Sequence, residues 1–176
     1  GNSVFMEYVK TNSGFDPLPM KNVDFGGGLE RIAAAKSNEP DMFLISSFSE
    51  LKTKLEDMSG TEYTNSQVQT HAYRVIMDHV RAAVFLVSDG VIPSNKDQGY
   101  FARRLLRRVI RYGKNLGIKT VFTSELAEVV INEYSKSYPE LSNNRDLIID
   151  ELSKEEEKFR KTLVKGEKEF EKRFLA

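Results

Sequence analysis

In DGVIPSNKDQGYFARRLLRRVIRYGKNLG, residues 89–117, turn-forming residues lead directly into a long helical pattern. Asp89-Gly90 and Pro93 indicate a turn, and Ser94 and Asn95 carry side-chain oxygens that can cap a helix. An apolar stripe then recurs at helical spacing. Its members are Phe101, Ala102, Leu105, Leu106, Val109 and Ile110. The stretch therefore predicts a loop followed by an amphipathic helix.

The same helix carries five arginines within nine residues, which repel one another on an isolated helix. They are Arg103, Arg104, Arg107, Arg108 and Arg111. Residues 96–119 hold eight bases and one acid, a local charge of +7 in a chain of zero net charge. One interpretation is a surface helix whose arginines pair with acids elsewhere in the fold. The other is a phosphate-binding helix, because guanidinium groups bind phosphate oxygens bidentately. In that case Asn95, at the helix N-terminus, can read a base edge.

Composition narrows the class of protein. The 176 residues suit one medium or two small domains, and the 40% hydrophobic content supports a core. The absence of cysteine excludes disulfides and thiolate metal sites. No apolar run reaches membrane-spanning length, so we expect no membrane partner and a cytoplasmic location.

The N-terminal part predicts two strands, at residues 4–9 and 19–25, joined by a long connection as a β-hairpin. Two strands alone are marginally stable, so the hairpin is expected to belong to a larger sheet. Glycines 26–28 then lead into a helix at 29–35, and such a junction lets a ligand approach the backbone closely. A further helix is expected at 41–58.

The remaining sequence predicts helices near 66–88, 98–116, 124–138 and 144–175. Ser66 and Gln69 form a capping-box pattern before the first of them. His71 and His79 are interpreted as structural histidines. The last helix has an eleven-residue apolar repeat, and its nearly balanced charges are interpreted as solvated surface. The expected fold is mainly α: a helical bundle preceded by a short antiparallel β remnant.

Several motifs in order resemble the alanyl-tRNA synthetase family of class II aminoacyl-tRNA synthetases. Val23 to Arg31, VDFGGGLER, resembles motif 3, and Asn2 to Tyr8 resembles the strand upstream of it. Residues 74–81, RVIMDHVR, and 89–108 resemble the helical tRNA-recognition region, and 155–166 the long helix that follows it. The resemblance implies a boundary between residues 1–60, the end of the catalytic domain and its sheet, and residues 61–176, the tRNA-recognition domain.

The resemblance also implies roles for individual residues. The family activates alanine with ATP and Mg²⁺ and transfers it to the 3′ end of tRNA(Ala). Asp24 matches the carboxylate that holds the alanine ammonium, with Gly26 and Asn2 bordering the alanine. Arg31 and Gly28 match ATP-binding positions. Asn95 matches the asparagine that contacts the acceptor-stem G·U pair, and the five arginines would hold the acceptor-stem backbone.

Other parts of the family pattern are expected outside these residues. They include motifs 1 and 2, the second wobble-pair contact, the editing domain with its zinc ligands, and the oligomerisation domain. The isolated chain is therefore not expected to activate alanine, nor to bind a cofactor tightly. Phe25 and Gln98 depart from the residues usual at their positions.

Three hypotheses follow from the sequence. The first is an alanine–tRNA ligase fragment that supplies motif 3 and acceptor-stem binding. The second is a non-catalytic RNA-binding module related to the synthetase. The third is a helical interaction domain whose arginines pair internally, and it predicts RNA binding that is weak and insensitive to the arginines.

Overall fold

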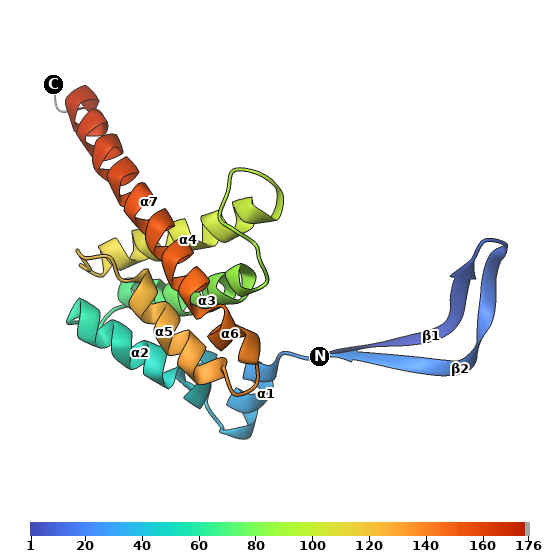
Figure 1. The fold of residues 1–176 in the computed structure, drawn as a ribbon. Helices are drawn as coiled ribbons and strands as arrows, with labels where there is room; N and C mark the ends of the chain where they lie inside the picture. Colours follow the sequence, from blue (N-terminus) through green and yellow to red (C-terminus); the bar gives the residue numbers. More distant parts are fainter. Residues whose placement is uncertain (175–176) are drawn as a thin grey trace. The chain divides into compact units, whose positions relative to one another are not determined.

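A computed structural model describes residues 1–174, and their contacts divide the chain into two units. The first unit is Gly1–Ile45, and the second begins at Ser46. The first contains an antiparallel hairpin and a short helix, and the second is entirely helical (Figure 1). The prediction of a mainly α chain with a short β element is confirmed.

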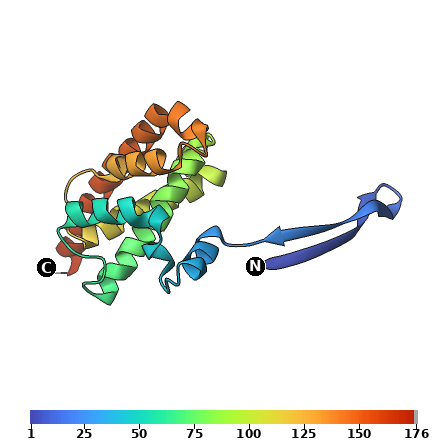
Figure 2. The same cartoon turned by 90° about the horizontal axis from the view of Figure 1, so that it is seen from below.

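The hairpin consists of β1 (Asn2–Thr11) and β2 (Gly14–Gly26), and both strands are longer than predicted. The expected long connection is wrong, because only residues 12 and 13 separate the strands. Gly14 follows them with φ 139°, a value that L side chains rarely adopt. The register of the two strands shifts between Met6 and Tyr8, an irregularity that commonly bends a sheet, and the hairpin ribbon is bent along its length (Figures 1 and 2).

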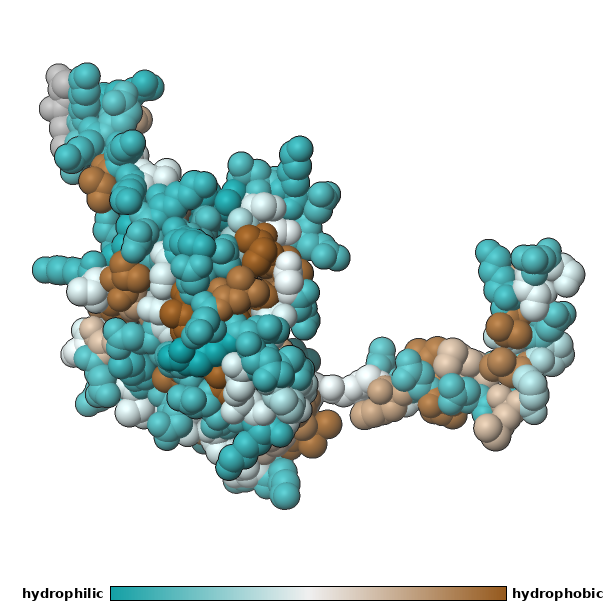
Figure 3. Space-filling model, viewed as in Figure 1, coloured by the Kyte–Doolittle hydropathy of each residue, from teal (hydrophilic) through white to brown (hydrophobic). Residues whose placement is uncertain are grey.

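Both faces of the hairpin expose large apolar side chains, and brown patches mark such side chains on the side seen in Figure 3. They include Val4, Phe5, Tyr8, Val9, Phe15, Met20, Val23 and Phe25. A sheet that is apolar on both faces is normally covered on both faces. The exposure fits the prediction that the hairpin belongs to a larger sheet.

The chain continues into α1 (Leu29–Lys36), which starts directly after the glycines as predicted. The expected single helix at 41–58 is divided in two. A 3-10 turn, η1 (Met42–Leu44), begins where Asp41 Oδ1 accepts a hydrogen bond from the Phe43 N–H at 3.0 Å. Ile45 is extended, with ψ 160°, and therefore separates the turn from α2 (Ser46–Ser59).

The second unit is a bundle around α3 (Gln67–Ser88), which contacts α2, α4 (Asp97–Asn115), α5 (Thr123–Tyr134), α6 (Pro139–Asn143) and α7 (Arg145–Phe174). Tyr73, Met77 and Val84 of α3 are buried, as are Ala72 and Ile76, so buried side chains occur on more than one face of this helix. The reason is that neighbouring helices surround α3. No helix among residues 1–174 is long and apolar enough to cross a membrane.

Helix boundaries follow local chemistry. Ser66 Oγ accepts a hydrogen bond from the Gln69 N–H at 3.2 Å, which confirms the predicted cap of α3. The helix expected at 124–138 instead ends at Tyr134, and Pro139 begins α6. The predicted boundary at residue 60 separates two functions, whereas the boundary after Ile45 separates two groups of structural contacts. The functional boundary stays a prediction.

The buried residues of the last helix, α7, all lie in its first half. Ile148 and Leu152 are fully buried, whereas Phe170 and Phe174, in the projecting part, are 59% and 72% exposed (Figure 1). The predicted end at residue 175 lies outside the described residues. Helices α4 and α5 both contact α7, and Glu155 in the first half of α7 accepts hydrogen bonds from Arg103 and Arg107 of the arginine-bearing helix.

Candidate functional site

The loop before α4 has a fixed shape. The Ser94 N–H donates to the Gly99 carbonyl at 2.9 Å, and the Ser94 hydroxyl donates to the Lys96 carbonyl at 3.0 Å. A Cβ on Gly99 would lie 2.4 Å from the Ile92 carbonyl oxygen, so only glycine allows this approach. The loop carries Asn95 as an exposed residue at the entrance to α4.

Arg103 lies inside the bundle, with 9% of the residue exposed. Its Nε donates to Glu155 Oε2 at 3.2 Å, its Nη2 donates to the Pro93 carbonyl at 3.1 Å, and its Nη1 donates to Asn95 Oδ1. The guanidinium thus joins α7, the loop and Asn95. Arg103 therefore matches the interpretation in which an arginine of this helix pairs with an acid elsewhere in the fold.

Arg107 shares the same carboxylate. Its Nε donates to Glu155 Oε1 at 2.9 Å, and its guanidinium lies 4.9 Å from the ring centroid of Phe159. The Arg107 side chain is 36% exposed, while that of Glu155 is 5% exposed. Internal pairing therefore accounts for two of the five arginines.

The other three arginines, Arg104, Arg108 and Arg111, are exposed. Among residues 1–174 none of them has a hydrogen bond or an ion pair. Their spacing of four and three residues places them along one face of α4, and the exposed Tyr100 continues that face by one turn. The structure thus presents a row of three uncompensated guanidinium groups beside an aromatic ring.

Glu155 was missed as a functional residue, because the charges of the last helix were all interpreted as solvated surface. That interpretation is wrong for Glu155 and Glu156, which are 5% and 0% exposed. Glu156 Oε2 accepts from the Phe122 and Thr123 N–H groups at the start of α5, at 3.1 and 2.8 Å. The signal was available: both acids lie three and four residues after Leu152, on the apolar face of α7.

In the first unit the strand register brings three predicted residues together. Asn2 pairs with Gly26 and Val4 with Asp24, and opposite residues of an antiparallel pair share a face. Asn2, Asp24 and Gly26 therefore lie on one face of the hairpin, and Phe25 on the other. A Cβ on Gly26 would meet Asn2 Oδ1 at 2.6 Å, so the asparagine amide lies directly over the glycine.

Gly28 is the N-cap residue of α1, and Arg31 is an exposed residue in its first turn. A Cβ on Gly28 would meet nothing closer than Arg31 Cδ, at 3.4 Å. The backbone of the glycine is thus open to a ligand, and the free N–H groups of a helix start favour phosphate. The ATP-binding role that the resemblance implies for these two residues stays a prediction.

The two histidines have local partners. His71 Nε2 lies 3.2 Å from the Tyr112 hydroxyl, and His79 Nδ1 lies 2.8 Å from Asp78 Oδ2. The hydrogen bond with His79 holds the pKa of the Asp78 carboxyl below its usual value, although partial burial opposes the shift. Among residues 1–174 no three metal-binding side chains cluster.

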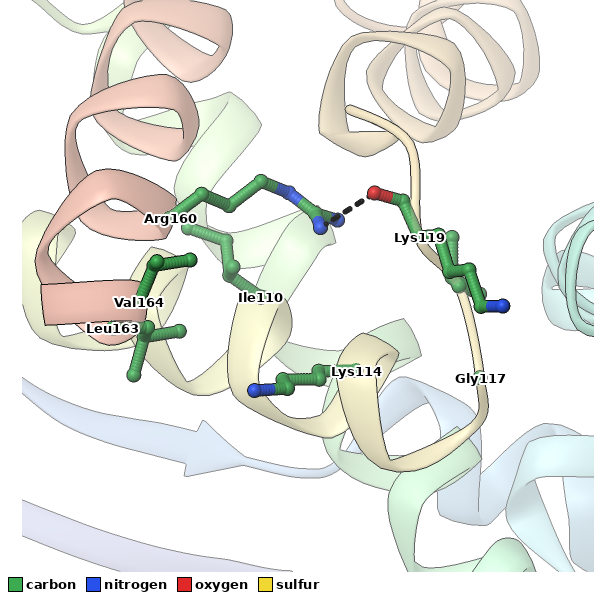
Figure 4. A pocket seen from close by; sticks show the side chains of 8 residues that line it. Ile110, Lys114, Gly117, Lys119, Arg160, Leu163 and Val164 are labelled. Atoms are coloured by element: carbon green, nitrogen blue, oxygen red, sulfur yellow. Dashed lines mark hydrogen bonds between the residues drawn. The ribbon is translucent and has the colours of Figure 1, made fainter. Parts of the chain in front are cut away.

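A pocket of about 310 Å³ lies between the end of α4 and α7 (Figure 4). Ile110 and Leu163 are among its lining residues. Two of its three cationic lining side chains, those of Arg160 and Lys114, have partners within the chain. Arg160 Nη1 donates to the Lys119 carbonyl at 3.0 Å, drawn as a dashed line, and Lys114 pairs with Glu167. The pocket therefore offers less free positive charge than the outer face of α4.

Comparison with known proteins assigns the chain to a class. A family model described as tRNA synthetases class II (A) matches residues 1–175. The chain therefore belongs to the class II (A) tRNA synthetases.

The relatives within this class are alanine–tRNA ligases. The chain is 42% identical to that of Pseudothermotoga lettingae over 166 residues, which is 94% of this chain and 19% of the relative. It is 44% identical to that of Borreliella afzelii over 172 residues, 96% of this chain and 29% of the relative. The chain spans less than a third of the length of these relatives, and it resembles them along nearly its whole sequence.

Proposed function

We propose that the second unit binds the acceptor stem of tRNA(Ala) through the outer face of α4. The observation that carries this proposal is the row formed by Arg104, Arg108 and Arg111, exposed and without an internal partner. Three unpaired guanidinium groups on one helix face repel one another, and phosphate oxygens relieve that repulsion. Arg107, partly exposed, can add a contact, whereas Arg103 acts from inside.

Asn95 is proposed to read a base of the stem, at the G·U pair that the family resemblance implies. It is exposed on a loop that Gly99 and Arg103 hold in place. Phosphate contacts set the position of the RNA, and a side-chain amide beside them can form hydrogen bonds with a base edge. The proposed interface is therefore the loop together with the outer face of α4.

The first unit is proposed to contribute to alanine activation as part of a complete alanine–tRNA ligase. Asp24 would hold the alanine ammonium, Asn2 and Gly26 would border the alanine, and Arg31 with Gly28 would hold ATP. The register supports this proposal by placing Asn2, Asp24 and Gly26 on one face. ATP is used with Mg²⁺, but none of the described side chains is assigned to the metal. This role belongs to protein synthesis in the cytoplasm.

Titration of an alanine acceptor-stem hairpin RNA at several salt concentrations tests the proposal. We expect an Arg104/Arg108/Arg111 triple alanine variant to bind more weakly and to lower the slope of log K against log salt by about 2 to 3. The matched control removes three cations from α7: Lys158, Lys161 and Lys165, which are also exposed. Equal effects of the two triple variants would contradict a specific role for α4.

The internal-pairing hypothesis makes the opposite prediction for the same experiment. Internal pairing is observed for Arg103 and Arg107, which form ion pairs with Glu155. Within residues 1–174 it is not observed for Arg104, Arg108 and Arg111. Under it, the triple variant would bind RNA as the unchanged chain does.

A further inference from the structure

Arg103 connects the exposed Asn95 to the buried Glu155 through a chain of hydrogen bonds. A guanidinium has five N–H groups in a rigid plane, and here groups on all three nitrogens are used: toward Glu155, the Pro93 carbonyl and Asn95. The loop and its asparagine are thereby fixed relative to α4 and α7.

This arrangement is costly if its only role is stability. Both charged groups are almost fully buried, at 9% exposure for Arg103 and 5% for Glu155. Well-packed apolar residues in place of a buried ion pair are often as stabilising or more so. The buried Arg103–Glu155 pair is hydrogen-bonded to the exposed amide of Asn95. The pair is therefore better explained by its holding that amide in position.

The direction of the hydrogen bond determines which end of the amide is available. Asn95 Oδ1 accepts from Arg103 Nη1, so the Nδ2 amino group is the end that remains for a ligand. An amino group donates two hydrogen bonds and accepts none. Asn95 in this orientation is suited to acceptor atoms on a base edge and unsuited to amino groups.

We propose that Arg103 and Glu155 are positioning residues for base reading: they hold the Asn95 amide with its nitrogen toward an acceptor atom of the RNA base pair. The inference rests on the proposed function of Asn95 and deepens it. Neither Arg103 nor Glu155 needs to touch the RNA. Their substitution therefore reduces discrimination between base pairs and leaves the phosphate contacts of α4 in place.

The test measures the ratio of the dissociation constants for two hairpin RNAs that differ only in a G·U or G·C pair. The variants are Asn95→Ala, Arg103→Lys, Glu155→Gln and the double variant Asn95→Ala/Arg103→Lys. Arg145→Lys is the matched control, because Arg145 makes ion pairs with Glu128 and Asp146 away from the loop. Circular dichroism sets a temperature at which every variant is folded.

We expect Asn95→Ala to lower the ratio about tenfold, because alanine lacks the amide that would form the hydrogen bond with the base edge. Arg103→Lys should lower it about fivefold with the salt slope unchanged, because a lysine ammonium cannot reproduce the planar fork. The double variant should match Asn95→Ala alone, and Arg145→Lys should match the unchanged chain. A role in stability alone would move the unfolding temperature and leave the ratio intact.

Two negative results are distinguishable. If Asn95→Ala lowers the ratio but Arg103→Lys and Glu155→Gln do not, the positioning inference is overturned and the proposed function survives. If the unchanged chain shows no preference, or Asn95→Ala keeps it, base reading by Asn95 is overturned together with this inference. Should Arg103→Lys fail to fold, Glu155→Gln decides, since a glutamine oxygen still accepts a hydrogen bond but lacks the charge.

Discussion

At the scale of single residues, two glycines on helices of the second unit have opposite requirements. Gly99, in the first turn of α4, is buried against the Ser94 hydroxyl and the Ile92 carbonyl. Gly166, on the projecting part of α7, has nothing within 4 Å of the position of a Cβ. Glycine is therefore required where it shapes the Asn95 loop and is dispensable on the exposed helix.

We expect Gly99→Ala to lower the free energy of unfolding by about 1–3 kcal/mol, because the new methyl group overlaps backbone. It should also weaken the preference for one base pair, because the loop that holds Asn95 moves. Gly166→Ala is the matched control and should increase helix content, with a gain of up to about 1 kcal/mol. Urea unfolding and circular dichroism measure both. Equal stability of the two variants would contradict the described contacts of Gly99.

At the scale of elements, the carboxylate of Glu56 in α2 fixes the segment that connects α2 to α3. Glu56 Oε1 accepts from the Tyr63 N–H at 3.0 Å, and Glu56 Oε2 accepts from Lys52 Nζ at 2.7 Å. Burial raises the pKa of the Glu56 carboxyl, but these hydrogen bonds outweigh it, and the pKa is lowered overall. The ionised form is thus favoured in the folded chain.

A lowered folded pKa stabilises the chain above the unfolded pKa of about 4.3, and this stabilisation is lost as the pH falls through the folded pKa. Glu56→Gln keeps an acceptor for Tyr63 but cannot ionise. The difference in free energy of unfolding between the two proteins should be constant from pH 7 to 5 and narrow toward pH 3. Lys52→Gln, as a control, should reduce the pH-dependent part. A constant difference down to pH 3 would contradict the role of the Glu56 charge.

The elements also show how far the sequence could predict the structure. Helical periodicity and the Ser66 cap located α3, α4 and α7, because those signals are local. The inward direction of Arg103 depends on Glu155, 52 residues later, and no spacing rule reports such a partner. The sequence also failed to predict the break at Ile45 and the two-residue hairpin turn. In both places the helix or strand propensity of the residues on either side dominated the prediction.

The residues of the candidate site could likewise be predicted only in part from the sequence. Asn2, Asp24 and Gly26 were grouped by resemblance, and the strand register supplies the physical reason for grouping them. The outer row of α4 could not be separated from Arg103 and Arg107, because all five arginines look alike in sequence. Their separation required the position of α7.

At the scale of the whole molecule, the chain carries parts of two proposed sites in separate contact units. Asp24 and Asn2 are exposed on an open two-stranded ribbon. An ammonium and a carboxylate about 4 Å apart attract by only about 1 kcal/mol in water. The ribbon alone therefore provides too little binding energy to hold alanine.

We expect this chain to show no alanine-dependent exchange of pyrophosphate into ATP above a blank without enzyme. A full-length alanine–tRNA ligase serves as the positive control, and substituting asparagine for its residue that matches Asp24 should remove most of the exchange activity. Exchange by the chain alone would contradict this prediction and show that the residues described here suffice for activation.

A nuclear magnetic resonance titration of the acceptor-stem hairpin into the chain, observing the arginine Nε–H signals, tests directly whether the outer face of α4 binds the RNA. We predict that the signals of Arg104, Arg108 and Arg111 shift on RNA binding. The signal of Arg103, whose Nε–H is bonded to buried Glu155, should stay nearly unchanged. Shifts confined to residues away from α4, or no shifts in the outer row, would contradict the claim that this helix face binds the RNA.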